Sequence, residues 1–151
     1  MPRTGEEPTV LFACTMNAVR SPMAAAILSH LLGQSYRVAS AGVRAGVSDP
    51  YAVAVMDEMG IDISEHEPRA LTEIGDEMFD LIVTLSPESH HHGVELTRTM
   101  AAEVEYWPTL DATVLGGEGE LESVLERYRA VRDELFTRIK ARFGTGRGPN
   151  V

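Results

Sequence analysis

Short apolar runs alternate along the chain with segments whose apolar residues recur at helical spacing. The runs are typical of buried β-strands, and they cover residues 9–13, 36–41, 79–85 and 104–107. The segments between them carry the sequence signals of helix starts and ends. Strands that alternate with helices predict a parallel sheet covered by helices on both faces. We therefore expect one α/β domain, without an internal repeat or an interdomain linker.

Proline after a capping residue marks the start of three predicted helices. Each pair combines an N-cap side chain with a proline at the first helical position, and the pairs are Ser21-Pro22, Asp49-Pro50 and Ser86-Pro87. The first two helices are expected to end at Gly33 and Gly60, since glycine is common just past a helix C-terminus. A short helix is predicted over residues 69–74. A long amphipathic helix is predicted from an apolar stripe that comprises Leu121, Leu125, Tyr128, Val131, Leu135, Ile139 and Phe143.

The only cysteine of the chain, Cys14, follows directly on the first apolar run. One cysteine excludes an intramolecular disulfide and a zinc site built from several cysteines. A lone cysteine is often just a small buried core residue. In open parallel sheets, however, ligands bind at the carboxyl ends of the strands. The sequence thus places its single thiol where this fold class usually has its binding site.

The segment from Cys14 to Ser21 has the features of an oxyanion site. A loop that winds into a helix N-terminus points several backbone N–H groups inward, and these groups bind anions. Arg20 adds a planar guanidinium that matches two phosphoryl oxygens, and the same positive surroundings favour a reactive thiolate at Cys14. Ser21 is expected both to cap the helix and to donate its hydroxyl to this thiolate. The residues expected to line a bound oxyanion are Thr15, Met16, Asn17, Ala18, Val19 and Ser21.

Composition and charge narrow the class of protein further. A length of 151 residues suits one domain, and an apolar share of 44% allows a packed core. The formal net charge of −10 disfavours nucleic acid and anionic membranes as partners. The first residues are polar, unlike a signal peptide, and the apolar runs are too short to cross a membrane. We expect a cytoplasmic monomer or weak dimer, with flexible tails at residues 1–8 and 144–151.

The residues of the Cys14 loop carry a family resemblance. The pattern Cys-x-x-Asn-x-x-Arg-Ser-Pro-Met-Ala resembles the signature of the low-molecular-weight protein tyrosine phosphatases and of their arsenate-reductase relatives. Similar segments follow at residues 40–42, 49–53, 60–69, 79–84 and 132–135. The resemblance implies a single three-layer phosphatase domain over residues 9–143. Its central four-stranded parallel sheet would have the flavodoxin-like strand order 2-1-3-4, with helices on both faces.

The resemblance also implies a role for each residue that matches a family position. Cys14 would attack phosphorus, Arg20 would hold the phosphoryl oxygens, and the cysteinyl phosphate would then be hydrolysed. The group that supports the loop and the thiolate would consist of Asn17, Ser21, Ser40 and His66. Asp111 is the only aspartate between the fourth predicted strand and the last helix, and it matches the family's general acid. The proline that follows this acid in relatives is replaced here by Ala112.

The implied activity is metal-independent hydrolysis of phosphate monoesters without a cofactor. The substrate is expected to be a phosphorylated protein or a small aryl phosphate, and phosphate, sulfate or similar oxyanions are expected to inhibit. Thr113 and Val114 stand where relatives that act on phosphotyrosine carry aromatic residues, which weakens the expectation of a phosphotyrosine protein. Val19 stands where many relatives have a second, protective cysteine.

Three other functions are compatible with the same sequence. An arsenate reductase would share the loop, but relatives coupled to thioredoxin need further cysteines, so this chain would depend on an external thiol. A non-catalytic phosphoprotein-binding module would bind phosphate tightly without turnover. A structural domain of flavodoxin-like fold would have an ordinary thiol at Cys14.

Three consecutive histidines, His90-His91-His92, form a tract of the kind that binds metals. Consecutive helical residues point in three directions, however, and cannot chelate one ion together. We therefore interpret the tract as a solvated helix start.

Overall fold

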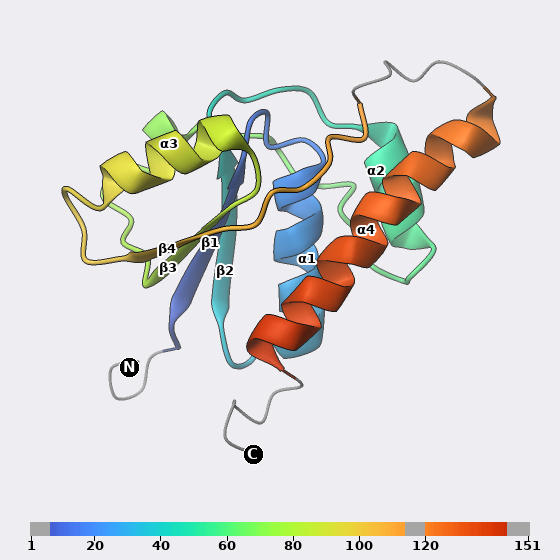
Figure 1. The fold of residues 1–151 in the computed structure, drawn as a ribbon. Coiled ribbons are helices and arrows are strands. Elements are labelled where there is room, and N and C mark those ends of the chain that lie inside the picture. Colours follow the sequence, from blue (N-terminus) through green and yellow to red (C-terminus); the bar gives the residue numbers. More distant parts are fainter. Residues whose placement is uncertain (1–6, 114–119, 145–151) are drawn as a thin grey trace.

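The computed structural model describes residues 7–113 and 120–144, and it confirms the predicted α/β architecture (Figure 1). Four strands form one parallel sheet in the order β2-β1-β3-β4, as the resemblance implied. The strands are β1 (Thr9–Cys14), β2 (Arg37–Gly42), β3 (Leu81–Thr84) and β4 (Glu103–Tyr106). The helices are α1 (Arg20–Leu32), α2 (Pro50–Asp57), α3 (Pro87–Leu96) and α4 (Leu121–Phe143). Most of each predicted flexible tail lies outside the described residues, and so does Val114.

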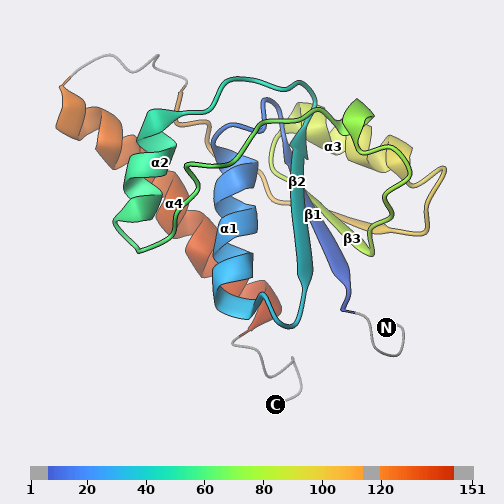
Figure 2. The ribbon, with the colours of Figure 1, turned by 180° about the vertical axis from the view of Figure 1, so that it is seen from behind.

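The sheet separates two apolar layers (Figures 1 and 2). α1, α2 and α4 cover one face of the sheet, and α3 lies on the other. Side chains of β1 alternate between the layers, as the pleat of a strand requires. Val10, Phe12 and Cys14 belong to the cluster with α1, α2 and α4, whereas Leu11 and Ala13 belong to the opposite cluster. Cys14 therefore points to the side of the sheet on which α1 packs.

Two of the three predicted helix caps are confirmed. Oδ1 of Asp49 accepts hydrogen bonds from the backbone N–H groups of Tyr51 and Ala52 at the start of α2. Oγ of Ser86 accepts a hydrogen bond from the backbone N–H of Ser89 at the start of α3. Both helices have a proline in the first turn, where its missing N–H leaves no hydrogen bond unmade.

The predicted cap of α1 is wrong. This helix begins at Arg20 with Val19 at the N-cap position, and no side chain caps it. Ser21 lies inside the first turn, where its Oγ is 3.0 Å from Cys14 Sγ and accepts a hydrogen bond from Asn17 Nδ2 over 2.8 Å. The hydroxyl of Ser21 is thus engaged by the cysteine loop and not by the helix terminus.

Other predicted elements are shorter in the structure. α2 ends at Asp57, before the turn that leads to Gly60. The short helix predicted over residues 69–74 is a single 3₁₀ turn, Leu71–Glu73. The Glu73 carboxylate accepts a hydrogen bond from the backbone N–H of Ala70 and caps this turn locally. A run of such i→i+3 bonds seldom extends further.

α3 packs closely on the sheet because Gly93 lies where the two meet. A Cβ atom at this position would be 2.8 Å from Cγ2 of Thr84. His90 stacks on Tyr106 with ring centroids 4.6 Å apart, and its Nδ1 lies 3.0 Å from Thr84 Oγ1. Among residues 7–113 and 120–144, no three His, Cys, Asp or Glu side chains are placed to hold one metal ion. The contacts of His90 with Thr84 and Tyr106 contribute to the packing of α3 on β3 and β4.

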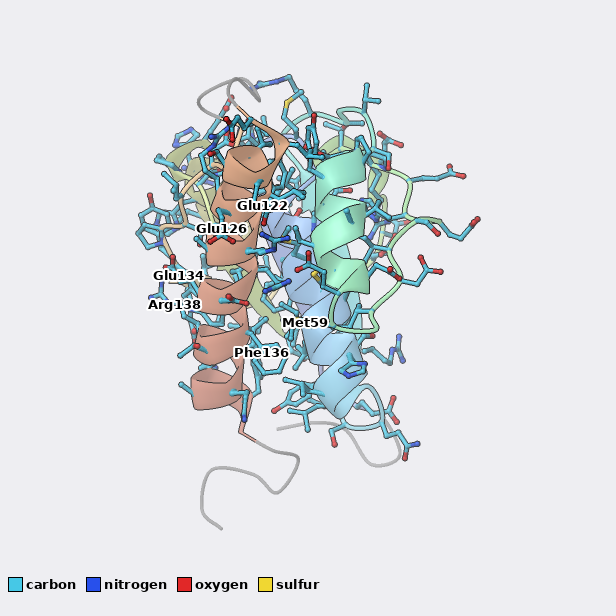
Figure 3. All side chains as sticks on the ribbon, turned by 90° about the vertical axis from the view of Figure 1, so that its right-hand side faces the viewer. Met59, Glu122, Glu126, Glu134, Phe136 and Arg138 are labelled. Carbon is cyan, nitrogen blue, oxygen red and sulfur yellow. The ribbon has the colours of Figure 1, made fainter. Side chains whose placement is uncertain are left out.

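The longest helix, α4, buries an apolar stripe against α1 and α2. Its buried apolar residues are Val124, Tyr128, Val131, Leu135, Ile139 and Phe143. They match the predicted stripe except at its start, where Leu121 is 61% exposed and Val124 is buried instead. Figure 3 shows Met59 and Phe136, which pack against the same cluster, on the side of the molecule formed by α2 and α4. Within the described residues, no helix combines the length and the apolar character needed to cross a membrane.

Charged side chains tie α2 to α4. Glu58, just after α2, binds two arginines of α4, with Arg129 Nη2 and Arg132 Nη1 each 2.8 Å from a carboxylate oxygen. Glu122 and Glu126 of α4 are further partners of Arg129 (Figure 3). Hydrogen bonds from the two arginines lower the pKa of Glu58 to about 2.

The substitution Glu58→Gln is expected to remove an acid-sensitive part of the stability. Because the pKa of Glu58 lies below its ordinary value of 4.5, the ionised group stabilises the fold fully above about pH 4.5, and this contribution is lost as the pH falls toward about 2. The variant should be less stable than the wild type near neutral pH and low salt, and the difference should disappear near pH 2. Urea unfolding at several pH values measures this, with Glu134→Gln on α4, whose ion pair with Arg138 is longer at 3.8 Å, as control. A stability difference that does not change with pH would contradict the assignment.

Candidate active site

Cys14 lies where the chain leaves the sheet and enters the loop that leads to α1 (Figure 1). The residue is 2% exposed. Two groups face its sulfur: Ser21 Oγ at 3.0 Å, and the backbone N–H of Asn17, which donates over 3.3 Å. Hydrogen-bond donors around a sulfur at a helix N-terminus are the surroundings that a thiolate nucleophile requires.

Asn17 supports the loop through hydrogen bonds of its side chain. It is fully buried and has a φ of 54°, a left-handed conformation that asparagine tolerates better than most residues. Its Nδ2 donates to Ser21 Oγ over 2.8 Å and to Ser40 Oγ over 3.0 Å. The structure thus brings together Asn17, Ser21 and Ser40, which the resemblance had grouped.

His66 and Arg69 complete this support. His66 Nε2 lies 2.9 Å from the carbonyl oxygen of Asn17. The backbone N–H of Arg69 donates to Asn17 Oδ1 over 2.9 Å, and its Nε donates to the carbonyl oxygen of Ser40 over 3.0 Å. Arg69 was not among the predicted site residues. The sequence did offer one signal for Arg69, because it lies with His66 in the segment 60–69 that resembles the family.

The chain after β2 forms a second support that the sequence did not reveal. Backbone N–H groups of residues 43, 44 and 46 donate to the carbonyl oxygens of Cys14, Thr15 and Met16 over 3.0, 2.8 and 2.8 Å. This close approach depends on Gly42, because a Cβ atom there would lie 2.7 Å from the backbone nitrogen of Asn17. The loop is therefore held both by backbone hydrogen bonds from residues 43–46 and by the hydrogen bonds of the Asn17 side chain.

The side chains of Arg20 and Asp111 lie close to each other. Arg20 is 8% exposed, and its Nη1 donates to the carbonyl oxygen of Thr109 over 3.2 Å. Its Nη2 lies 3.7 Å from Asp111 Oδ2. The segment after β4 thus brings the predicted acid to the predicted phosphoryl clamp.

Cys14, Arg20 and Asp111 line one cavity of about 180 Å³. Its other lining residues are Met16, Ala18, Val19, Gly46, Val47, Asp49 and Thr113. Arg20 is the only lysine or arginine among these residues, and two aspartates, Asp49 and Asp111, line the same cavity. A positive potential for an oxyanion must therefore come from Arg20 and from backbone N–H groups of the loop.

The other predicted lining residues take different positions. Ala18 and Val19 line the cavity, and Met16 does so while remaining 43% exposed. The hydroxyl of Thr15 instead donates to Ser86 Oγ at the start of α3 over 3.0 Å. The side chain of Thr15 therefore contributes to holding the loop on α3.

Two tyrosines lie beside the cavity. Tyr51 and Tyr128 line an adjoining hollow of about 280 Å³, which shares Val47, Asp49 and Thr113 with the cavity. The two rings are 5.4 Å apart, and the Tyr128 hydroxyl donates to Asp49 Oδ2 over 2.8 Å. Burial and this hydrogen bond hold the pKa of Tyr128 well above its usual range, so its phenol stays neutral.

A larger cleft of about 470 Å³ lies between α1, β2 and residues 62–69. Ser40, His66 and Arg69 belong to its walls, together with part of α1. None of Cys14, Arg20 and Asp111 lines it. The chemistry that these three residues can perform is therefore confined to the smaller cavity.

A thiol and a guanidinium lie on one loop at the carboxyl end of a parallel sheet, an arrangement that can bind a tetrahedral oxyanion. The family model of the low molecular weight phosphotyrosine protein phosphatases matches residues 9–144. The chain belongs to this family, in agreement with the resemblance of its loop.

Similar proteins within this family are named either arsenate reductases or phosphatases. An arsenate reductase of Halalkalibacterium halodurans is 36% identical over 91% of this chain and 96% of its own length. The solved structure of an arsenate reductase in a phosphate-binding state has a TM-score of 0.73 at 27% identity, and the match covers 89% of this chain and 95% of that one. A mutant of YwlE arginine phosphatase with a phosphorylated active-site serine has a TM-score of 0.71 at 26% identity, covering 87% of this chain and 91% of that one.

Oxidation of Cys14 is expected to proceed without an internal route of repair. Val19 is buried where many relatives have a second cysteine, and Cys14 is the only cysteine of the chain. Peroxide should therefore convert Cys14 to sulfinic and sulfonic acids, which dithiothreitol does not reduce, unless a small thiol is present during oxidation. Mass spectrometry of the Cys14 peptide measures this. If no small thiol is present during oxidation and dithiothreitol added afterwards still restores all of the free thiol, the expectation is refuted. Val19→Cys is the matched variant in which dithiothreitol should restore the thiol, because a disulfide between residues 14 and 19 can be reduced.

Proposed function

We propose that this protein hydrolyses phosphate monoesters through a phosphoryl group bound covalently to Cys14. The observation that carries the proposal is the convergence of Cys14, Arg20 and Asp111 on one cavity of about 180 Å³. This size suits a phosphoryl group, because sites for whole drug-sized ligands begin at about 300 Å³.

The first step transfers the phosphoryl group to the sulfur. Cys14 Sγ uses its electron pair to form the bond to phosphorus while the bond from phosphorus to the leaving-group oxygen breaks. Arg20 and the loop N–H groups hold the phosphoryl oxygens, over which the charge of the transition state is spread. Asp111 gives a proton to the departing oxygen, so that a neutral alcohol or phenol leaves.

The second step releases inorganic phosphate. A water molecule attacks phosphorus and gives a proton to the Asp111 carboxylate, which is now a base. The bond between sulfur and phosphorus breaks, and its electron pair returns to Cys14 Sγ. The two steps balance with water as the only co-reactant.

The surroundings of the cavity support an aryl leaving group. Of the two tyrosines that line the adjoining hollow, Tyr51 is partly exposed and offers an aromatic surface beside the cavity, whereas Tyr128 is 3% exposed. They come from α2 and α4, and not from the segment after the acid where relatives carry their aromatic residues. The phenyl ring of a substrate whose phosphoryl group is held by Arg20 next to Cys14 would extend toward this hollow past Val47 and Thr113, which line both spaces.

The two carboxylates of the cavity favour a second substrate class. Asp49 and Asp111 line the cavity together with a single guanidinium, that of Arg20. This excess of carboxylates disfavours acidic phosphopeptides and favours a positively charged leaving group. The structural similarity to YwlE arginine phosphatase is consistent with this class. Phosphoarginine is therefore the second substrate to compare; it is a phosphoramidate, so a P–N bond would break in place of the P–O bond and Asp111 would protonate the departing nitrogen.

Arsenate reduction is the alternative that the curated relatives favour. Reduction of arsenate to arsenite needs two electrons, and one thiol of this chain cannot supply them by forming an internal disulfide. An external thiol would have to provide the second sulfur and form a mixed disulfide with Cys14. The single cysteine thus favours hydrolysis over reduction.

A substrate panel tests the proposal. We expect turnover of phenyl phosphate or phosphoarginine in the absence of thiol, and little arsenite from arsenate with glutathione and glutaredoxin. Arsenite production without turnover of any phosphate compound would establish the reductase instead. Tight binding of inorganic phosphate with no turnover of either kind, unaffected by Asp111→Asn, would identify a binding module.

A further inference from the structure

We propose that Thr113 is a positioning residue for the acid, which fixes the Asp111 carboxylate so that one chosen oxygen faces the leaving group. The inference rests on the proposed function, because it assigns a task to Asp111 within that reaction. It concerns the place in the sequence where the expected proline is missing and where relatives carry aromatic side chains.

The two oxygens of Asp111 have different partners. Oδ1 accepts two hydrogen bonds from Thr113, one from the backbone N–H over 2.9 Å and one from the hydroxyl over 2.6 Å. Oδ2 lies 3.7 Å from Arg20 Nη2, on the side of the phosphoryl clamp. Since Thr113 occupies Oδ1, the proton that is transferred must be held at Oδ2.

The backbone at this point is anchored by other means. Ala112 is 1% exposed and belongs to the core cluster that includes Val124 and Tyr128 of α4. Arg127 Nε lies 3.5 Å from its carbonyl oxygen. Packing on α4 therefore replaces much of the rigidity that a proline would give to the chain.

A rigid backbone does not orient a carboxylate. The χ2 torsion of aspartate joins an sp³ to an sp² carbon and has broad, shallow preferences. A proline at position 112 would leave this torsion free, whereas two hydrogen bonds to one oxygen restrict it. Thr113 thus supplies an orientation that proline could not supply.

The hydroxyl is the part of Thr113 that a substitution can remove selectively. Thr113→Val keeps the shape of the side chain and the backbone N–H bond, and Thr113→Ser restores a hydroxyl. The test compares kcat/KM of the variants for a series of aryl phosphates whose leaving groups range from p-nitrophenol to phenol. Good leaving groups depart without protonation, whereas poor ones depend on the acid.

Thr113→Val is expected to lower kcat/KM about 10-fold for phenyl phosphate and less than about 3-fold for p-nitrophenyl phosphate, which makes the dependence on leaving-group pKa steeper. Inhibition by inorganic phosphate should stay within about 2-fold of the wild type, since the loop is untouched. Thr113→Ser should restore most of the activity on phenyl phosphate. Thr97→Val, at the exposed end of α3, is the control for loss of a threonine hydroxyl.

Each outcome decides the inference. Equal losses on all leaving groups would show that Thr113 has only a structural role, and wild-type behaviour of Thr113→Val would show that it has none in the reaction. Either result overturns the positioning role while the wild type still turns over substrate. A wild type that hydrolyses none of the series would overturn the proposed function, and the positioning role with it.

Discussion

Replacement of Cys14 by serine is expected to abolish turnover of every phosphate substrate. The loss should be on the order of 10⁴-fold or more, because a serine hydroxyl at this position lacks a base to activate it and the phosphoryl group has no other acceptor. Steady-state rates on phenyl phosphate and phosphoarginine, followed by release of inorganic phosphate, measure the effect.

Binding distinguishes loss of the nucleophile from loss of the fold. Arg20 and the backbone of the loop are unchanged in Cys14→Ser, so calorimetry should give an affinity for inorganic phosphate within a few-fold of the wild type. Unchanged turnover in this variant would refute the covalent route. A related solved structure holds a phosphorylated active-site serine, and a slow, single phosphorylation of the new serine would accordingly agree with the mechanism.

Replacement of Asp111 by asparagine is expected to have the second largest effect. General acid catalysis contributes about 10²–10⁴-fold, so kcat/KM for phenyl phosphate should fall by on the order of 10²-fold or more. The loss should be much smaller for p-nitrophenyl phosphate. The limb of the pH–rate profile that reports deprotonation of the acid should disappear in the variant.

An exposed aspartate provides the control for Asp111→Asn. Asp76 lies outside the cavity residues, and Asp76→Asn removes one negative charge without removing the acid. This variant should keep the wild-type pH profile and leaving-group dependence. If Asp111→Asn also keeps the wild-type pH profile and leaving-group dependence, another group protonates the leaving oxygen and Asp111 is not the general acid.

The sequence allowed prediction of those parts of the fold and site that depend on local pattern. The apolar run before Cys14 and the caps at Asp49 and Ser86 are local signals, and the structure confirms the strand and both caps. Ser21 had the same local signal but a different outcome. Its hydroxyl is taken up by Cys14 and Asn17, because the left-handed turn at Asn17 brings them into reach.

Contacts between distant segments could not be predicted in this way. Asp111 was found only through the family resemblance, since nothing near it in the sequence indicates that the segment after β4 reaches Arg20. Arg69 supports Asn17 partly through its backbone N–H, a group that almost every residue possesses and that leaves no compositional signal. Thr113 attracted attention only as a missing aromatic residue, and its bond to Asp111 becomes visible in three dimensions.

The central claim is that Cys14 carries the phosphoryl group between the two steps. Under the proposed mechanism, Asp111→Asn should slow the attack of water more than the first transfer from p-nitrophenyl phosphate, because p-nitrophenolate leaves without protonation. Rapid quenching in acid after mixing with this substrate should therefore trap the intermediate. Mass spectrometry should then find one added phosphoryl group on the peptide that contains Cys14, and none in the Cys14→Ala variant. Turnover of the same substrate with an unmodified Cys14 at all reaction times would contradict the account.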